Sequence, residues 1–560
     1  MKHCYIDIET DLSYGTIWCV ATIVDDVETL HFDASTLPAP DEYIYVAHYG
    51  LGFDFPRLAE LWGWDVPANR QLDTVLLSKL HDANRKGGHS LRVLALEAGA
   101  ETKDDFDVED FDKGYTEKMG AYCMQDVRAL RSVHLYLTAQ MNKMGFDYRC
   151  VDMEHQVRRL TNIQTANGFK LDMEQATNLY VDTVGRQREI EATLQEKFPP
   201  IITKRVSQKT GKPLKDGVEV FNIGSRPQIA RRLETLGVRW SKRTEKGSII
   251  VSETTLAPLA DKYPEAGLCL EYLTLGKKAS MLNAWLKHVN PEGRVNGMVD
   301  TLGAITGRMT HQRPNLAQVD GSAEMRSCWI VEEGQKLVGV DASGLELRML
   351  AHYMNDEDYI QEILDGDIHW ANAIAFGLVR DDVDYDGDKP ELVAIRNQAK
   401  TLIYAMLYGA GDEKLGSVVD SGRGTGARLR ADFLRSLPAY ADLVDRVTVA
   451  AKRGYIVGLD GRRLRVRHQH AALNTLLQGA GAIVMKQALV IGCRALDDSP
   501  VAYKLVAQVH DEVQVETPKR FADHVASTFK QAIVEAGEEL GMRIPLAGDS
   551  SIGTNWSHTH

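Results

Sequence analysis

The sequence predicts a multidomain α/β protein, and three observations lead to that prediction. Short apolar strand patterns alternate with helical patterns through residues 1–140, as they do in an α/β domain. Strand patterns return at 335–341 and 504–516, with long helical stretches between them. The chain has 560 residues, which is enough for roughly three to four domains.

The individual elements follow from the spacing of apolar residues. "HCYIDIE" (3–9) and "YIYVAHYG" (43–50) predict strands. A basic loop is expected at 199–221, after two prolines that end the preceding helical pattern. Helical spacing is found at 73–84, 117–141, 153–198, near Ser225, and at 264–289, 390–408, 470–496 and 520–541.

Composition narrows the function classes. The net charge of −13 argues against coating nucleic acid through bulk charge, although the basic runs 204–215 and 461–470 allow a local basic channel. We find no apolar run of the roughly 20 residues that a membrane span needs, and the start "MKHCYIDIET" does not fit a signal peptide. Seven scattered cysteines without a C-x-x-C pair predict free thiols in a reducing compartment and no zinc site.

Four carboxylates near the start form a candidate metal site. Asp7 and Glu9 lie two apart on a predicted strand, so both side chains project from one face. Adjacent carboxylates repel unless a cation lies between them, which favours a hard divalent metal. Asp54 and Asp126 fit the same site, and Tyr122 precedes Asp126 by one helical turn.

This D-x-E…D…Y-x-x-x-D set, over about 1–140, resembles the DEDD family of 3′–5′ exonucleases in its tyrosine-containing subtype. The resemblance implies an RNase H-like domain whose four acids hold two Mg²⁺ or Mn²⁺ ions. It also implies that Tyr122 helps to orient the attacking water.

A second group of acids lies in the other half of the chain. Asp341 ends the apolar strand pattern "KLVGVD", where it is exposed at a sheet edge and can hold a metal. "YKLVAQVHDEVQVE" (503–516) predicts two strands joined at His510-Asp511-Glu512. Taken alone, this triplet is better explained as a polar turn.

One predicted helix carries two cations and two phenols. In "RNQAKTLIYAMLYGAG", Arg396, Lys400, Tyr404 and Tyr408 recur every four residues and therefore lie on one stripe. Taken alone, the stripe fits a solvated amphipathic helix equally well.

In chain order, Asp341, the Arg396–Tyr408 stripe and Asp511 resemble motifs A, B and C of family A (DNA polymerase I-type) DNA polymerases. "TGRMTHQRPNLAQ" (306–318) and "HAALNTLLQGAGA" (470–482) resemble two further motifs of that family. The resemblance spans nearly the whole chain and is nearest to the replicative polymerases of T-seven-like podophages. It implies a right-hand polymerase that copies a primed template from dNTPs and proofreads, in phage genome replication.

The resemblance also implies roles for single residues. Asp341 and Asp511 would hold two Mg²⁺ ions, for which Mn²⁺ can substitute. The triphosphate contacts would be Arg396, Lys400 and His369. Tyr404 would stack beside the incoming sugar, Tyr408 would close over the templating position, and Glu346 would exclude a ribose 2′-hydroxyl. Contacts to the primer end and the minor groove would come from Arg308, Asn474, Gln478 and His510. The role of Glu512 is left open.

The resemblance predicts a division into exonuclease, thumb, palm, fingers and a second palm segment, at 1–145, 146–295, 296–350, 351–455 and 456–560. Podophage relatives carry a long thumb insertion that binds host thioredoxin, but the matching stretch here is the short basic loop 199–221. We therefore expect no thioredoxin partner. We expect duplex phosphates to contact Lys204, Arg205, Lys209, Lys212 and Lys215 directly.

The implied partners are primer-template DNA, dNTPs, and the phage helicase–primase and single-strand-binding protein, in the cytoplasm of an infected bacterial host. Three alternatives remain beside this interpretation. They are a single-subunit RNA polymerase, a nuclease whose C-terminal half only binds DNA, and a replication scaffold without catalysis.

Overall fold

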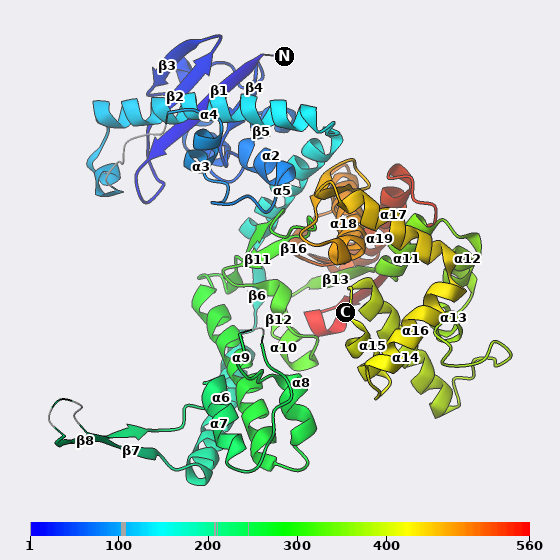
Figure 1. The fold of residues 1–560 in the computed structure, drawn as a ribbon. Coiled ribbons are helices and arrows are strands. Elements are labelled where there is room, and N and C mark those ends of the chain that lie inside the picture. The colour runs from blue at the N-terminus through cyan, green and yellow to red at the C-terminus, as the bar shows by residue number, and fades with distance from the viewer. Residues whose placement is uncertain (1, 102–107, 207–208, 210, 245) are drawn as a thin grey trace. The chain divides into compact units, whose positions relative to one another are not determined.

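The computed structural model describes residues 2–101, 108–206, 209, 211–244 and 246–560. It is a mixed α/β protein with two compact units (Figure 1). The larger unit contains residues 1–168, 297–318 and 331–560, and the smaller one contains 169–296 and 319–330.

The larger unit begins with a five-stranded sheet in the order β3-β2-β1-β4-β5. The central strand β1 pairs antiparallel with β2 and parallel with β4. The elements are β1 (His3–Thr10), β2 (Ile17–Val24), β3 (Val27–His31), β4 (Ile44–Ala47), β5 (Gln71–Asp73), α1 (Asp54–Trp62), α2 (Thr74–His81), α3 (Leu91–Glu97) and α4 (Glu117–Lys143). The strands predicted at 3–9 and 43–50 and the helices predicted at 73–84 and 117–141 are confirmed.

Local sequence explains where these helices start. The side chain of Thr116 accepts the backbone N–H of Met119 and so begins α4, while Asp73 caps α2 through Val75. The apolar face of α4 is buried against the sheet through residues such as Val127, Leu130 and Val133. This packing fixes which face of α4 points away from the core.

The larger unit continues with a four-stranded antiparallel sheet in the order β16-β17-β13-β18. Helix α19 packs on β13 and β18, and α18 packs on α19. These elements are β13 (Gln335–Ala342), β16 (Lys504–Val509), β17 (Glu512–Pro518), β18 (Gly548–Gly553), α18 (Ala472–Asp497) and α19 (Ala522–Glu539). The strands predicted near 335–341 and 504–516 are confirmed.

The remaining elements of the larger unit are mostly helical. They are α5 (Arg149–Asn167), α11 (Leu345–Met354), α12 (Glu357–Asp365), α13 (Ile368–Ala375), α14 (Pro390–Leu407), α15 (Asp412–Val418), α16 (Arg423–Ser436), α17 (Pro438–Ala451), β10 (Met298–Asp300), β11 (Thr310–Gln312), β14 (Tyr455–Val457) and β15 (Arg463–Arg465). The predicted helix at 390–408 is confirmed as α14, and Tyr408 is its C-terminal cap residue.

Helix α18 corrects one expectation drawn from composition. The helical segment 469–497 is long and apolar enough, by length and hydropathy alone, to cross a membrane. The segment is this apolar because it lies in the core of the protein, where 89% of its most apolar stretch is buried. This is weak evidence for a span, and buried core helices commonly pass the same test.

The smaller unit is built around two long helices that pack on each other, α6 and α9. Its core contains Leu194, Phe221, Leu233 and Cys269. Its elements are α6 (Met173–Lys197), α7 (Arg226–Glu234), α8 (Glu253–Leu256), α9 (Pro264–His288), α10 (Ala323–Arg326), β6 (Phe169–Leu171), β9 (Arg294–Val295), β12 (Trp329–Ile330), β7 (Ile201–Val206) and β8 (Pro213–Glu219).

The expected loop at 199–221 is instead an antiparallel hairpin, β7–β8, in which Ile202 pairs with Val218. In Figure 1 it projects away from α6 and α7. β-Branched residues on both strands favour extended backbone, and the loop prediction underrated them against the Gly and Lys content. Lys209, one of the predicted phosphate contacts, is among the described residues, whereas residues 207, 208 and 210 are not.

All seven cysteines are buried and none forms a disulfide, so the predicted free thiols are confirmed. The predicted compartment stays a prediction.

Candidate active sites

The end of β13 brings one group of acids together. Asp341 pairs in register with Glu512 on β17 and with Asp549 on β18. His510 and Asp511 form the turn between β16 and β17, and the Asp511 carbonyl accepts the N–H of Ala342 at 3.1 Å. His510 has a φ of 57°, in the left-handed region that a tight turn can require. The predicted bend is confirmed for His510 and Asp511, while Glu512 already belongs to β17.

Burial and repulsion raise the pKa of Asp341 to about 7. Burial is the largest cause, followed by the charges of Asp511, Glu512, Asp549 and Glu346. A cation among these groups would relieve their repulsion, so the cluster fits a divalent metal ion. Sequence reasoning missed Asp549, because its neighbours in the chain carry no motif and only strand pairing brings it to Asp341.

Glu512 has a structural task that the sequence left open. Its buried carboxylate accepts the indole N–H of Trp556 at 2.5 Å and contacts His560 Nδ1 at 2.8 Å. It also accepts a hydrogen bond from Gln514. Glu512 therefore ties the C-terminal segment to β17, directly across from Asp341.

The phenols of the predicted stripe lie close to the acids. Tyr408 donates to Glu346 Oε1 at 3.4 Å, and the same oxygen lies 3.4 Å from Arg308 Nη2. Burial raises the pKa of Tyr404 to about 12, and the charges of Glu346 and Asp511 contribute to that rise. Four motifs separated in sequence thus meet in one place.

The cations of the stripe lie in the middle of α14, N-terminal to the phenols. Helix α13, which carries His369, packs against α14. Burial lowers the pKa of His369, and the charges of Arg396 and Lys400 lower it further. The Nδ1 atom of His369 is buried and has no hydrogen-bond partner within the described ranges. An anion or another polar ligand would satisfy it.

The four predicted DNA contacts come from three elements. Asn474 and Gln478 lie one turn apart near the start of α18, and the buried Oδ1 of Asn474 has no hydrogen-bond partner in the described part of the chain. Arg308 and His510 line a small cavity of about 20 Å³ together with Lys486 and Gln508. Among the described residues, neither Asn474 nor Gln478 lines this cavity.

The N-terminal acids form a second cluster. The ligand atoms of Asp7, Glu9 and Cys123 lie within 4.8 Å of one another. Asp54, at the first position of α1, is only 3% exposed. Its pKa is raised to about 7, chiefly by burial and then by the charges of Asp73 and Asp126, while hydrogen bonds from its own backbone N–H and that of Ile8 oppose the rise. The Ile8 interaction places the Asp54 carboxyl against the backbone of β1, the strand that carries Asp7 and Glu9.

Two members of this site were not predicted. The Cys123 thiol lies 3.7 Å from Asp7 Oδ2, and its pKa is raised well above the ordinary value by burial, Cys19 and the neighbouring acids. Asp73 holds the loop before Asp54 by accepting the N–H groups of Tyr49 and Leu51. The only sequence signal for Cys123 was its place beside Tyr122, whose ring contacts Phe111.

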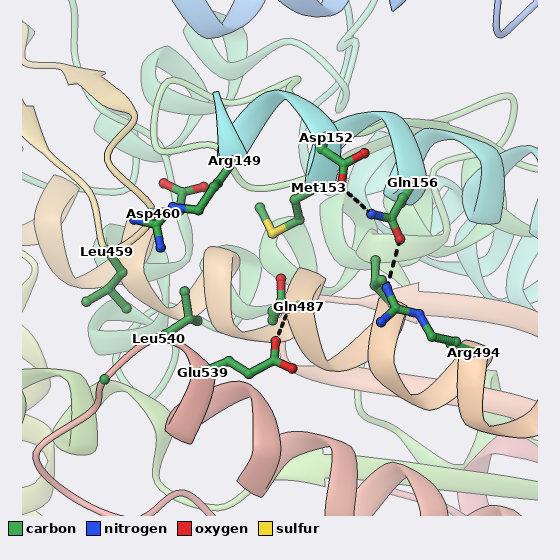
Figure 2. A pocket seen from close by; sticks show the side chains of 12 residues that line it. Arg149, Asp152, Met153, Gln156, Leu459, Asp460, Gln487, Arg494, Glu539 and Leu540 are labelled. Carbon is green, nitrogen blue, oxygen red and sulfur yellow. Dashed lines mark hydrogen bonds between the residues drawn. The ribbon is translucent and has the colours of Figure 1, made fainter. Parts of the chain in front are cut away.

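A larger cavity, of about 460 Å³, lies apart from the predicted residues (Figure 2). Figure 2 shows Gln156 between Asp152 and Arg494, and Gln487 bonded to Glu539. None of the predicted site residues lines it. Its walls come from α5, α18, the loop between β14 and β15, and the end of α19.

Comparisons with known proteins identify the family of this chain. A family model described as DNA polymerase family A matches residues 196–558. The DNA-directed DNA polymerase of Escherichia phage T7 is 30% identical over 92% of this chain and 92% of its own length, and that of Enterobacteria phage T3 gives the same values. A thermostable DNA polymerase I of Thermus thermophilus is 27% identical over 90% of this chain and 63% of its own length.

A solved structure shares the fold. It is described as the POL domain of Pol1 from M. smegmatis in complex with DNA primer-template and dNTP. The TM-score is 0.81 at 19% identity, and the match covers 99% of this chain and 95% of that one.

The chain therefore belongs to DNA polymerase family A. The predicted family resemblance is confirmed, and DNA synthesis that depends on divalent metal ions is the activity of that family.

Proposed function

We propose that this family A enzyme extends a primer on a DNA template with dNTPs, at the site formed by Asp341, Asp511 and the α14 stripe. The observation that carries the proposal is the meeting of Asp341, Asp511, Glu346, Tyr404 and Tyr408 in one cluster, although the sequence separates them by up to 170 positions. No motif alone explains that convergence.

The chain's own residues would divide the work. Asp341 and Asp511 would hold Mg²⁺, for which Mn²⁺ could substitute, because hard oxygen ligands suit both ions. Bound divalent ions would lower the pKa of the primer 3′-hydroxyl and offset charge on the triphosphate. Arg396, Lys400 and His369 would bind the phosphates. Tyr404 would stack beside the sugar, and Tyr408 would cover the templating position.

Glu346 would select the sugar. Its carboxylate contacts both Tyr408 and Arg308 and is therefore held beside the place proposed for the nucleotide. A ribose 2′-hydroxyl would meet this fixed group. Arg308, Asn474, Gln478 and His510 would contact the primer end and the minor groove, where acceptors are common to correct base pairs.

We propose a proofreading 3′–5′ exonuclease for the N-terminal region, with an RNase H-like fold. Its support is the mixed sheet whose central strand carries Asp7 and Glu9 beside Asp54. The charge of Asp126 raises the pKa of Asp54, which supports Asp126 as the fourth ligand. Tyr122 would orient the water from the helix that carries Asp126.

We keep the predicted division into exonuclease (1–145), thumb (146–295), palm (296–350 and 456–560) and fingers (351–455) as part of the proposal. The hairpin β7–β8 lies within the proposed thumb and exposes Lys204, Arg205, Lys212 and Lys215. These cations would contact duplex phosphates.

We propose that thioredoxin is not needed for processive synthesis. The alignment with the T7 polymerase runs over 667 residues, more than the 560 of this chain, so that relative carries segments that this chain lacks. Primer extension with and without thioredoxin tests the proposal, and product lengths should be equal. A large gain in length with thioredoxin would refute it.

The proposed setting is phage genome replication in the cytoplasm of an infected bacterium, with phage helicase–primase and single-strand-binding protein as partners. The similarity to phage T7 and T3 polymerases supports this setting.

The central test is extension of a primed template with Mg²⁺ and either dNTPs or rNTPs. We expect dNTP incorporation, strong discrimination against rNTPs, and no extension by Asp341→Ala. Equal use of rNTPs would favour the RNA polymerase alternative. Primer extension by the Asp341→Ala variant would refute the proposed role of Asp341 as a metal ligand.

A further inference from the structure

Asp367 joins two elements of the proposed triphosphate site. Its Oδ1 accepts the backbone N–H groups of His369 at 3.0 Å and Trp370 at 3.1 Å, which caps the start of α13. Its Oδ2 accepts the Nε–H of Arg396 at 2.6 Å. The two carboxylate oxygens therefore have different tasks, one toward α13 and one toward α14.

Asp367 is held at its backbone as well as at its side chain. The backbone N–H of Asp367 donates to Glu362 Oε1 at 2.9 Å, and the Asp367 side chain is 28% exposed. Burial acts to raise the pKa of Asp367, but hydrogen bonds from Arg396, Trp370 and His369 outweigh it and leave the pKa lowered. Asp367 is ionised at neutral pH and offers Arg396 a fixed anion.

The Arg396 guanidinium is held on one edge and one face. Asp367 accepts a hydrogen bond from the Nε–H, and the guanidinium carbon lies over the Tyr385 ring, 5.6 Å from the ring centroid. Tyr385 in turn contacts the Trp370 ring at 5.3 Å. No contact to the two terminal amino groups of Arg396 is found among the described residues, so both are available to an anion.

The geometry points to Asp367 as a positioning residue for the incoming nucleotide. We propose that it holds Arg396 by Nε so that the two terminal amino groups face the phosphates of a dNTP. This rests on the proposed role of Arg396 as a phosphate contact and extends it by one residue. A guanidinium with one edge fixed keeps its bidentate fork, and less freedom is lost when phosphate binds.

A purely structural role as the cap of α13 would give the same contacts to His369 and Trp370. Asp367→Asn separates the two roles, because the Asn side-chain oxygen caps helices as well as that of Asp, whereas the uncharged NH₂ group in place of Oδ2 cannot accept the Nε–H of Arg396. Asp367→Ser gives a second variant with a capping side chain. Asp356→Asn is the matched control, since Asp356 caps the neighbouring helix α12 through Tyr359.

The experiment measures single-nucleotide incorporation by the full chain, as KM for dNTP, kcat, and the inhibition constant of pyrophosphate. We expect Asp367→Asn and Asp367→Ser to raise KM and the pyrophosphate constant by about fivefold or more, with kcat within about threefold. Asp356→Asn should leave all three within about twofold. An unchanged or lower KM in both Asp367 variants would overturn the proposal.

A double-mutant cycle separates this proposal from the function on which it rests. If Asp367 acts through Arg396, adding Asp367→Asn to Arg396→Ala should change KM by less than about twofold. An additive effect would overturn the proposal while leaving Arg396 as a phosphate contact. If Arg396→Ala alone leaves KM unchanged, the proposed phosphate role of Arg396 fails, and the present inference fails with it.

Discussion

The two acid clusters of this chain reach similar pKa values by different arrangements. Asp54 begins a helix and is 3% exposed, and two neighbouring acids add to the effect of burial. Asp341 lies near the end of the central strand β13 and is less deeply buried, but the charges of four acids add to the effect of burial. Each carboxyl has a pKa of about 7. Burial is the largest cause at both carboxyls, and what differs is the set of neighbouring charges that adds to it.

The largest expected effect is loss of one activity without the other. Asp511→Ala should lower primer extension by about a thousandfold or more, because the variant lacks one of the two proposed metal ligands. The rate at which the Asp511→Ala variant hydrolyses single-stranded DNA from the 3′ end should stay within about twofold of the unsubstituted protein. Asp7→Ala should show the reverse pattern. Loss of both activities in either variant would mean that the clusters do not act independently.

The next effect concerns the buried ion network between α5 and α18. Glu154 is fully buried and contacts Lys486 at 2.6 Å and Arg462 at 2.7 Å. Glu154→Ala should lower the free energy of unfolding by roughly 3–5 kcal/mol, because it leaves buried cations without their partner.

Denaturant unfolding measures this change. The control is Asp442→Ala, which removes an exposed ion pair with Arg446 and should cost less than about 1 kcal/mol. Equal costs in both variants would show that the network is not buried in solution.

The pH dependence of metal binding tests both raised pKa values. A carboxyl with a pKa of about 7 is mostly protonated at pH 6 and must lose that proton to bind a metal ion. Affinity for Mn²⁺ should therefore fall about tenfold from pH 8 to pH 6 and level off above pH 8. Calorimetric titration of Asp7→Ala and Asp511→Ala would report each cluster separately.

The same shifts affect stability without metal. A carboxyl with a raised pKa stabilises the folded protein when protonated, so this contribution is present below about pH 4 and is lost as pH rises through about 7. Thermal unfolding of the metal-free protein, followed from pH 4 to pH 8, should show this loss of stability.

For the metal-binding experiment, an Mn²⁺ affinity that is flat between pH 6 and 8 would contradict both pKa values.

The smallest expected effect concerns Tyr404. If Tyr404 stacks beside the incoming sugar as proposed, its hydroxyl would stand in for the missing 3′-hydroxyl of a dideoxynucleotide, and Tyr404→Phe should lower dideoxynucleotide incorporation about tenfold relative to dNTPs. This is the value of one hydrogen bond of roughly 1.4 kcal/mol. Primer extension in an Asp7→Ala background measures it without excision. Equal discrimination by both proteins would refute the role of the hydroxyl.

Much of the C-terminal site was predictable from the sequence, because its residues stand in short motifs. Period-two spacing predicted β13 with Asp341 near its end, and period-four spacing predicted the stripe on α14. The hairpin β7–β8 was missed because its composition favoured a loop. The expectation that no segment is apolar enough to span a membrane was wrong for α18, because a buried core helix is as apolar as a span.

The sequence by itself determined the family, the order of the motifs, and the faces on which Asp7, Glu9, Arg396 and Tyr408 lie. These follow from backbone periodicity, which depends only on neighbours in the chain. Only the tertiary structure decided the partners that come from distant segments, which are Asp549 beside Asp341, the C-terminal segment on Glu512, Cys123 against Asp7, and Asp367 on Arg396. Strand register and helix packing create those contacts, and neither is encoded in local spacing.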